Sequence, residues 1–257
     1  MFLAIDIGNT NIVFGLFAGD ELICQWRMVT DAGQTADGYG AQLQGLFTGQ
    51  GLSCESVDAV VMASVVPLLD TAFRAVCEKL FRKEPLIVNS ETDTGIKLCY
   101  ETPQTLGADR IVNAVAAYAT CRCALIVIDF GTATTFDYVS ADGLYLGGAI
   151  APGIKTAGEA LFARAAKLPR IDFFYPEHVI GVSTIESLQS GIMAGYVGLV
   201  EGIIWRMKAE RGENPRVIAT GGLAPLIQSH TQSIHEVDEH LTLHGLKIIH
   251  DRNAIRR

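Results

Sequence analysis

The sequence lacks several features that would point to whole classes of protein. Its longest apolar stretches, such as 59–63 and 124–128, are far shorter than the roughly 20 residues that span a bilayer, so we expect no membrane partner. No basic run is longer than a pair, and the formal net charge is −8. Because binding to a nucleic-acid backbone needs a concentrated basic face, nucleic acid is a poor partner.

The cysteines lack the spacing of a zinc site. Six are scattered along the chain, and only Cys121 and Cys123 are close; one Cys-x-Cys lacks the second ligand pair that zinc needs. We therefore interpret all six as buried free thiols. The chain begins in a strand, without a basic segment or cleavage site, so we expect a cytoplasmic protein rather than a secreted one.

What the sequence does contain is an internal repeat. Residues 3–16 read LAIDIGNTNIVFGL and residues 125–136 read LIVIDFGTATTF. In each copy an apolar run leads into Asp-x-Gly and small polar residues, and a glycine–aspartate turn follows at 19–20 or 142–143. Glycine lets the backbone come close to a ligand, while N–H and hydroxyl groups supply donors, so each hairpin suits phosphate. Two such hairpins could grip a nucleotide between two lobes, which indicates a phosphotransferase.

The order of expected elements predicts an α/β fold of two duplicated, RNase H-like (actin-like) lobes. Each lobe is a mixed sheet that opens with three antiparallel strands and is flanked by helices. At 257 residues, with 49% hydrophobic and 19% charged residues, the chain suits two well-packed lobes. We place these lobes at 1–118 and 119–257.

The individual elements follow from apolar periodicity. We expect strands at 2–7, 12–17, 21–27, 59–63, 86–88, 124–129, 134–140, 143–150 and 217–220, and helices at 36–46, 67–81, 107–120, 156–166, 184–208 and from 224. Helix 184–208 has an apolar stripe of Ile185, Leu188, Ile192, Tyr196, Leu199 and Ile203. Residues 241–243, between two histidines, look extended rather than helical.

Two glycine-rich strand ends are candidate ligand sites. Asp6 could hold Mg²⁺ through water while the loop after it meets phosphates. The alternative is an Asx turn that only closes the hairpin, and the second copy at Asp129 argues against it. Gly221 and Gly222 fit a strand that ends against a flat ligand, although a simple turn explains the pair nearly as well.

The segment Gly107-Ala108-Asp109-Arg110 begins a helix and carries a candidate base. The helix dipole favours Asp109 whether or not it is functional. A phosphotransferase needs a carboxylate near its acceptor hydroxyl, to orient it and take its proton. Arg110 offers a fork of donors suited to a carboxylate substrate. Tyr100, just ahead, could line a substrate pocket or be an ordinary half-buried tyrosine.

Together these motifs resemble the type III pantothenate kinases of bacteria, members of the actin-like and sugar-kinase ATPase superfamily. The matching segments are 6–11, Tyr100, 107–110, 129–132, 147–153, 181–184 and 219–222. The resemblance implies transfer of the γ-phosphoryl group of ATP to the primary hydroxyl of pantothenate, the first step of coenzyme A synthesis.

The resemblance also implies roles for single residues. Asp109 resembles the base, and Asp129 the ligand of an activating K⁺ or NH₄⁺ ion, with Mg²⁺ held through water at Asp6. The implied ATP-binding residues are Asp6, Ile7, Gly8, Asn9, Thr10, Asn11, Ile12, Val13, Thr132, Gly221 and Gly222. Those for pantothenate are Tyr100, Gly107, Ala108, Asp109, Arg110 and Thr184. The family is dimeric, so the resemblance implies a homodimer in which the region of Thr184 completes the pocket across the interface.

Two other functions stay open on the sequence alone. One is a related accessory protein that regulates transcription, against which the acidic charge and the Asp109-Arg110 pair argue. The other is a different small-molecule kinase or phosphatase of the superfamily, which only the acceptor pocket distinguishes. The phosphate loop has Val13 and no phosphate-binding lysine. If the protein is a kinase, we therefore expect its ATP binding to be weak and to depend on magnesium.

Overall fold

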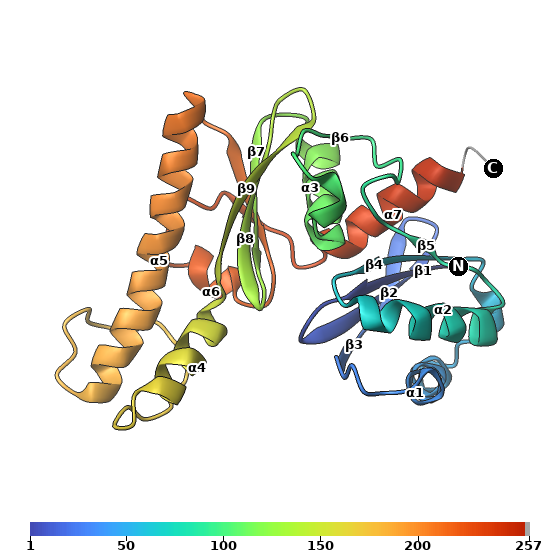
Figure 1. Ribbon diagram of the computed structural model, residues 1–257, viewed down its shortest axis with the longest axis horizontal. Helices are drawn as coiled ribbons and strands as arrows, with labels where there is room; N and C mark the ends of the chain where they lie inside the picture. The colour runs from blue at the N-terminus through green and yellow to red at the C-terminus, as the bar shows by residue number, and fades with distance from the viewer. Residues whose placement is uncertain (255–257) are drawn as a thin grey trace. The chain divides into compact units, whose positions relative to one another are not determined.

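The computed structural model describes residues 1–254, which divide into two units (Figure 1). Unit 1 comprises Met1–Ala116 together with the C-terminal helix α7 (Leu241–Ala254), and unit 2 comprises Ala117–His240. The expected second lobe, 119–257, included α7, which in the structure belongs to unit 1.

Close packing explains why α7 belongs to unit 1. A Cβ atom on Gly245 would lie 2.2 Å from the carbonyl oxygen of Val112 in helix α3 (Ala108–Cys121), so only glycine permits this approach of two helices. On the neighbouring sheet, the ring of Phe2 stacks on His250 with centroids 4.4 Å apart. Residues 241–243, expected to be extended, form the first turn of this helix.

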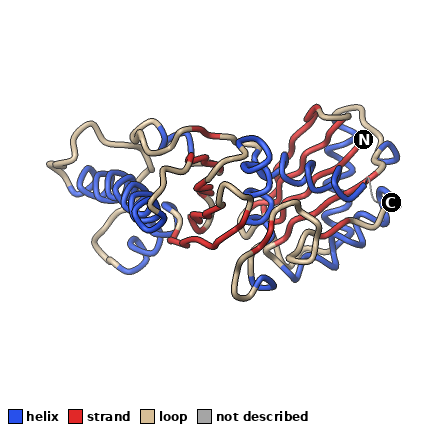
Figure 2. The backbone as a smooth tube through the Cα atoms, turned by 90° about the horizontal axis from the view of Figure 1, so that it is seen from above, coloured by secondary structure: helices blue, strands red, loops and turns tan. Residues whose placement is uncertain are grey.

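The sheet of unit 1, whose strands are among those drawn red in Figure 2, has the strand order β3-β2-β1-β4-β5. Strand β1 pairs antiparallel with β2 and parallel with β4. The strands are β1 (Phe2–Ile7), β2 (Asn11–Ala18), β3 (Glu21–Val29), β4 (Ala59–Ser64) and β5 (Leu86–Ile87); the helices are α1 (Ala36–Gly49), α2 (Pro67–Phe81) and the short η1 (Cys54–Ser56) and η2 (Pro103–Thr105). The two-residue strand β6 (Lys97–Leu98) lies between η1 and η2 in the chain.

Unit 2 repeats this topology strand for strand. Its strands run in the order β9-β8-β7-β10-β11, with β7 antiparallel to β8 and parallel to β10. They are β7 (Leu125–Phe130), β8 (Ala133–Val139), β9 (Leu144–Pro152), β10 (Arg216–Thr220) and β11 (Glu236–Val237), accompanied by α4 (Ile154–Arg164), α5 (Thr184–Arg211) and α6 (Ala224–Gln228). The duplicated α/β fold is thus confirmed.

The alternation of side chains along β1 decides where Asp6 faces. Leu3, Ile5 and Ile7 are fully buried in a core cluster with residues of α1 and α2. Because neighbouring side chains on a strand point to opposite faces, Phe2 and Asp6 face away from that cluster. In unit 2, Ile128 and Phe130 likewise pack into the core with α5, which turns Asp129 to the other face.

Helix α5 buries a different set of residues from the expected stripe. Of that stripe, Leu188 and Tyr196 are buried, but Ile185 is 50% exposed. The other buried members include Met193, Val200 and Ile204, which rotates the packed face by about one residue. Among the described helices, α5 has the length and composition to cross a bilayer, but it packs along the core of unit 2.

The thiols also differ from the prediction that all six are buried. Cys77 is buried, whereas Cys99 is exposed and the remaining four are half-buried. Burial raises the pKa of Cys77 to about 12, which makes it an inert core residue.

Candidate functional site

The first hairpin presents a short polar loop between β1 and β2. The N–H of Gly8 donates to the carbonyl of Asn11 at 3.0 Å, and Asn9 and Thr10 between them are exposed. Of the other predicted ATP-binding residues, Asp6, Asn11 and Val13 are half-buried, whereas Ile7 and Ile12 are fully buried. These two can reach a ligand only through their backbone, which fits a loop that binds phosphate mainly with peptide groups.

A residue that the sequence analysis missed fastens this loop. The hydroxyl of Thr30 donates to the carbonyl of Gly8 at 2.6 Å, and the Thr30 N–H donates to the carbonyl of Thr10 at 3.0 Å. The carbonyl oxygens of Gly8 and Thr10 are thereby held at the end of β3 by hydrogen bonds. They would otherwise repel a phosphate bound at this loop. Only a threonine or serine just past the third strand signals this role in the sequence.

Asp109 lies in the first turn of α3, where its carboxylate accepts the N–H of Arg110 at 2.8 Å. Burial is the largest influence on this group and raises the pKa of Asp109 above that of an ordinary carboxyl, against the opposing effects of Arg110. A Cβ atom on Gly107 would lie 2.5 Å from the Asp109 Oδ1, so Gly107 leaves room for the carboxylate. The basicity of this carboxyl is therefore increased by its burial, while the backbone N–H of Arg110 holds it in position and acts in the opposite direction.

Val65 connects Asp109 with the first hairpin inside unit 1. Its N–H donates to the carbonyl of Ile7 at 3.0 Å. Its Cγ1 lies 3.5 Å from where a Cβ of Gly107 would be. The phosphate loop and the start of α3 are therefore neighbours. Ala108 and Arg110 at this helix start are buried, at 7% exposure each, and Tyr100 in the preceding loop is half-buried.

The second hairpin has a tighter loop and faces a pair of glycines. The N–H of Gly131 donates to the carbonyl of Ala133 at 3.1 Å. Gly221, with φ +93°, follows the parallel strand β10, and a Cβ there would lie 2.8 Å from Asp129 Oδ1 and 2.7 Å from the carbonyl oxygen of Phe130. Because Gly221 has no side chain, the Asp129 carboxylate oxygen and the Phe130 carbonyl oxygen can both lie next to it. Such hard oxygen donors suit a cation like K⁺.

Thr132 is positioned by its own backbone. Its carbonyl accepts the N–H of Gly153 at 3.0 Å and the hydroxyl of Thr156 at 2.7 Å, while its side chain is exposed. Behind it, the hydroxyl of Tyr196 hydrogen-bonds Thr134 Oγ1 at 2.6 Å and donates to the carbonyl of Pro152 at 2.8 Å. Helix α5 thus fixes the second hairpin through a tyrosine that the sequence showed only as part of an apolar stripe.

Thr184 is exposed at the start of α5 and lies in an apolar surface. Ser183 caps the helix by accepting the N–H of Glu186, and the Glu186 carboxylate accepts the N–H of Val182, the residue before the cap. Around it, Ile180 is 86% exposed and Val182 90%. Such clustered apolar exposure is typical of a protein–protein interface.

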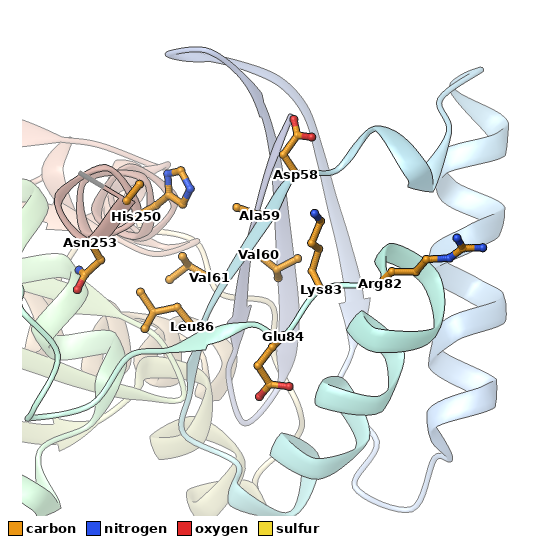
Figure 3. A pocket seen from close by; sticks show the side chains of 11 residues that line it. Asp58, Ala59, Val60, Val61, Arg82, Lys83, Glu84, Leu86, His250 and Asn253 are labelled. Carbon is orange, nitrogen blue, oxygen red and sulfur yellow. The ribbon is translucent and has the colours of Figure 1, made fainter. Parts of the chain in front are cut away.

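A hollow in the described part of unit 1 lies away from these residues (Figure 3). It has a volume of about 430 Å³ and is lined by β4, the α2–β5 loop and α7. Asp58 and Ala59 lie at the end where β1 and β4 begin, whereas Gly8 follows the end where they finish. None of the predicted site residues lines it.

The described residues contain no group of three or more His, Cys, Asp and Glu side chains that could hold a metal ion. Zinc-type centres, which need three or four such ligands, are therefore absent from residues 1–254. A site that binds Mg²⁺ through one carboxylate, water and phosphate oxygens has no such cluster, and Asp6 beside a phosphate loop fits that chemistry.

Comparisons with known proteins agree on one family. The model of the family described as Type III pantothenate kinase matches residues 2–206. A type III pantothenate kinase of Pelobacter propionicus is 51% identical over 253 residues, covering 98% of this chain and all of the relative; one of Geobacter sulfurreducens is 50% identical, covering 98% and 99%.

Solved structures show the same fold at much lower identity. A Campylobacter jejuni protein named as a Baf family transcriptional activator superimposes with a TM-score of 0.62 at 20% identity, covering 98% of this chain and 99% of that one. MreB 5 of Spiroplasma citri, bound to AMPPNP, gives 0.55 at 11% identity, covering 99% and 97%. At these identities the likeness shows the fold alone, which is actin-like in both units.

Proposed function

The chain belongs to the type III pantothenate kinase family, and on that premise we propose that it transfers the γ-phosphoryl group of ATP to the primary hydroxyl of pantothenate with Asp109 as the base. The observation that carries this assignment is the carboxyl of Asp109, half-buried at the start of α3 and joined through Val65 to the phosphate loop. The enzyme is an ATP-dependent kinase, and its reaction opens coenzyme A biosynthesis.

Asp109 acts on the acceptor hydroxyl. Its carboxylate accepts the hydrogen bond of that hydroxyl and takes the proton as the oxygen attacks the γ-phosphorus. Because burial raises the pKa of Asp109, the group holds the proton better than an exposed carboxylate would. Gly107, Ala108, Arg110 and Tyr100 surround the acceptor, and the Arg110 guanidinium binds the carboxylate of pantothenate.

The nucleotide is held by loops without a lysine. The peptide groups of residues 6–13 bind the phosphates in unit 1, and Thr132, Gly221 and Gly222 of unit 2 contribute the remaining nucleotide contacts. Asp6 would hold Mg²⁺ through water, and the ion would supply charge neutralisation at the phosphates. Asp129 and the carbonyl of Phe130 would hold a monovalent cation, which would add further positive charge beside the nucleotide.

The active protein is a cytoplasmic homodimer in which Thr184 serves the partner's pocket. The support is the apolar exposure of Ile180, Val182 and Ile185 around Thr184. A subunit-exchange experiment tests it. Asp109→Asn and Thr184→Ala are each expected to lower activity, and mixing the two variants should restore about a quarter of the wild-type rate. The reason is that half of the dimers are then mixed, and each mixed dimer has one intact site out of two. Absence of any recovery after proven exchange contradicts shared sites.

The central test is an assay of ATP-dependent pantothenate phosphorylation in the presence of K⁺ and Mg²⁺. Wild-type protein should turn over, and Asp109→Asn should not, whereas Asp142→Asn, at an exposed turn, should match the wild type. Full turnover by the Asp109 variant would remove this residue as the base. A wild-type protein without turnover would favour a regulatory protein with the kinase fold.

A further inference from the structure

Cys121 and Cys123 lie together where α3 ends and β7 begins. Both side chains are half-buried, and the two thiols are within hydrogen-bonding range of each other. Neither has a part in the proposed phosphoryl transfer. A pair of adjacent free thiols is chemically different from the isolated Cys99 or the deeply buried Cys77, because two thiols can react as a unit.

The backbone between the thiols has a shape that suits a disulfide. Arg122 adopts the left-handed conformation, with φ 48°. A residue with helical curvature of either hand brings its two neighbours' Cα atoms to about 5.4 Å from each other. This separation falls inside the usual range of about 4.4–6.8 Å for bridged cysteines. An extended residue at this position would hold the two Cα atoms near or beyond the upper limit.

Charged groups surround the pair. The guanidinium of Arg216, at the start of β10, is near enough to interact electrostatically with both thiols and is itself paired with Glu236 at 2.6 Å. The Arg122 side chain is directed over the ring of Tyr118, 5.3 Å from its centroid. Burial is the largest influence on Cys121 and raises its pKa, while Arg216 acts in the opposite direction. Reaction is therefore expected to accelerate as the pH rises and the thiolate forms.

We propose that Cys121 and Cys123 form a reversible redox site that low-molecular-weight organic disulfides convert to an intramolecular disulfide. One thiolate attacks a sulfur of the organic disulfide, forming a mixed disulfide and releasing one thiolate of the reagent. The second cysteine loses its proton to solvent and attacks the protein sulfur of the mixed disulfide, which releases the other thiolate. The two cysteines are oxidised by two electrons, and the reagent is reduced to two thiols.

Zinc binding is a weaker interpretation of the same pair. A stable zinc site needs two further ligands, and no group of three or more suitable side chains occurs within residues 1–254. The disulfide needs only the two thiols and the curved backbone between them.

The test uses oxidised glutathione on the full-length protein, followed by alkylation of the remaining thiols and tryptic digestion. Trypsin cleaves after Arg122, so the disulfide links two peptides, 111–122 and 123–155, which are separate when the pair is reduced. We expect the linked peptides to dominate, to form up to about tenfold faster for each unit of pH below the thiol pKa, and to separate after treatment with dithiothreitol.

Variants make the result decisive. Cys99→Ser should leave the linked peptides unchanged, because this exposed cysteine is outside the pair. Cys121→Ser should stop the reaction at a stable glutathione adduct on Cys123. The proposal is overturned if wild-type protein retains glutathione adducts at 121 or 123 without linkage. It is equally overturned if both thiols stay free and alkylatable while Cys99 in the same sample is glutathionylated.

Discussion

On the strand beside the phosphate hairpin of unit 1, the partner of Asp6 is followed by Ser64 and Val65, whereas the partner of Asp129 in unit 2 is followed by Gly221 and Gly222. The two hairpins also close differently. The loop hydrogen bond spans Gly8 to Asn11 in the first and Gly131 to Ala133 in the second, one residue less. One ancestral hairpin has thus been kept in topology and changed at its ligand-facing edge.

The difference separates two tasks. Val65 fills the space next to Ile7 and supports the start of α3, where Asp109 needs a dry and fixed position. The matching residues of unit 2, Gly221 and Gly222, have no side chain, and a Cβ on Gly221 would collide with Asp129 Oδ1 and the carbonyl oxygen of Phe130. Side-chain bulk in unit 1 builds a site for chemistry, and its removal in unit 2 builds a site for a cation and a nucleotide.

The largest expected effect is that of Asp109→Asn, which removes the base from unit 1 alone. We expect kcat/KM for pantothenate to fall about 10²- to 10⁴-fold. In the wild type, activity should be lost as the pH falls through the raised pKa of Asp109, because only the ionised carboxylate accepts the proton. A pH–rate profile measures both.

The same variant should not lose stability. A raised folded-state pKa means that the folded protein binds this proton more tightly than the unfolded chain, so ionisation at neutral pH lowers the free energy of unfolding. Removing the charge removes that penalty. A thermal midpoint well below that of the wild type at neutral pH would show that Asp109 has a structural role instead.

A second pair of substitutions compares the hairpins directly. Asp6→Asn should raise the Mg²⁺ concentration needed for half-maximal activity about 10- to 100-fold, and Asp129→Asn should do the same for K⁺. Activity titrations with each ion separate the two effects. If both variants change the dependence on the same ion, the proposed division between the hairpins is wrong.

Gly221→Ala tests the uncovered oxygens of unit 2. A Cβ at this position meets backbone and carboxylate atoms at 2.7–2.8 Å, and φ is +93°, so we expect about 1–3 kcal/mol lower stability and about tenfold weaker ATP binding by calorimetry. Gly198→Ala in helix α5 is the control, because its Cβ would have no atom within 4 Å and this residue is outside the proposed nucleotide contacts. Equal effects of the two changes would contradict the assignment.

The smallest expected effects concern the threonines that hold the loops. Thr30 donates to the carbonyl of Gly8 and Thr156 to that of Thr132, at 2.6 and 2.7 Å. Replacing either by valine removes one hydrogen bond worth about 1 kcal/mol, so the KM for ATP should rise about threefold to tenfold with kcat little changed. Steady-state kinetics of the double variant shows whether the loops act independently.

Much of the fold follows from local signals in the sequence. Helix α2 begins and ends where expected, because Pro67 suits the first helical position and Arg82 follows in the left-handed conformation that ends it. Helix α5 begins where the hydroxyl of Ser183 accepts the N–H of Glu186. The Asp-x-Gly repeat predicted both hairpins and the three antiparallel strands that open each sheet.

The missing parts depend on tertiary contacts. Helix α7 becomes helical around Gly245, which offers no strong local signal and packs on Val112 far away in the chain. The hydroxyls of Thr30, Thr156 and Tyr196 find carbonyl partners only after the strands have assembled. The contact between the Cys121 and Cys123 thiols requires the left-handed Arg122, a conformation that arginine rarely adopts.

The return of α7 to unit 1 has a consequence for how the protein is made. On the ribosome, the sheet of unit 1 emerges first, but α7 emerges only after all of unit 2. It is α7 that stacks His250 on Phe2 and pairs Lys247 with Asp20. An exposed apolar sheet face must therefore wait through the synthesis of residues 117–240. Loss of α7 should leave nascent chains that are prone to aggregation, even though every residue of the phosphate loop and the base has already been translated.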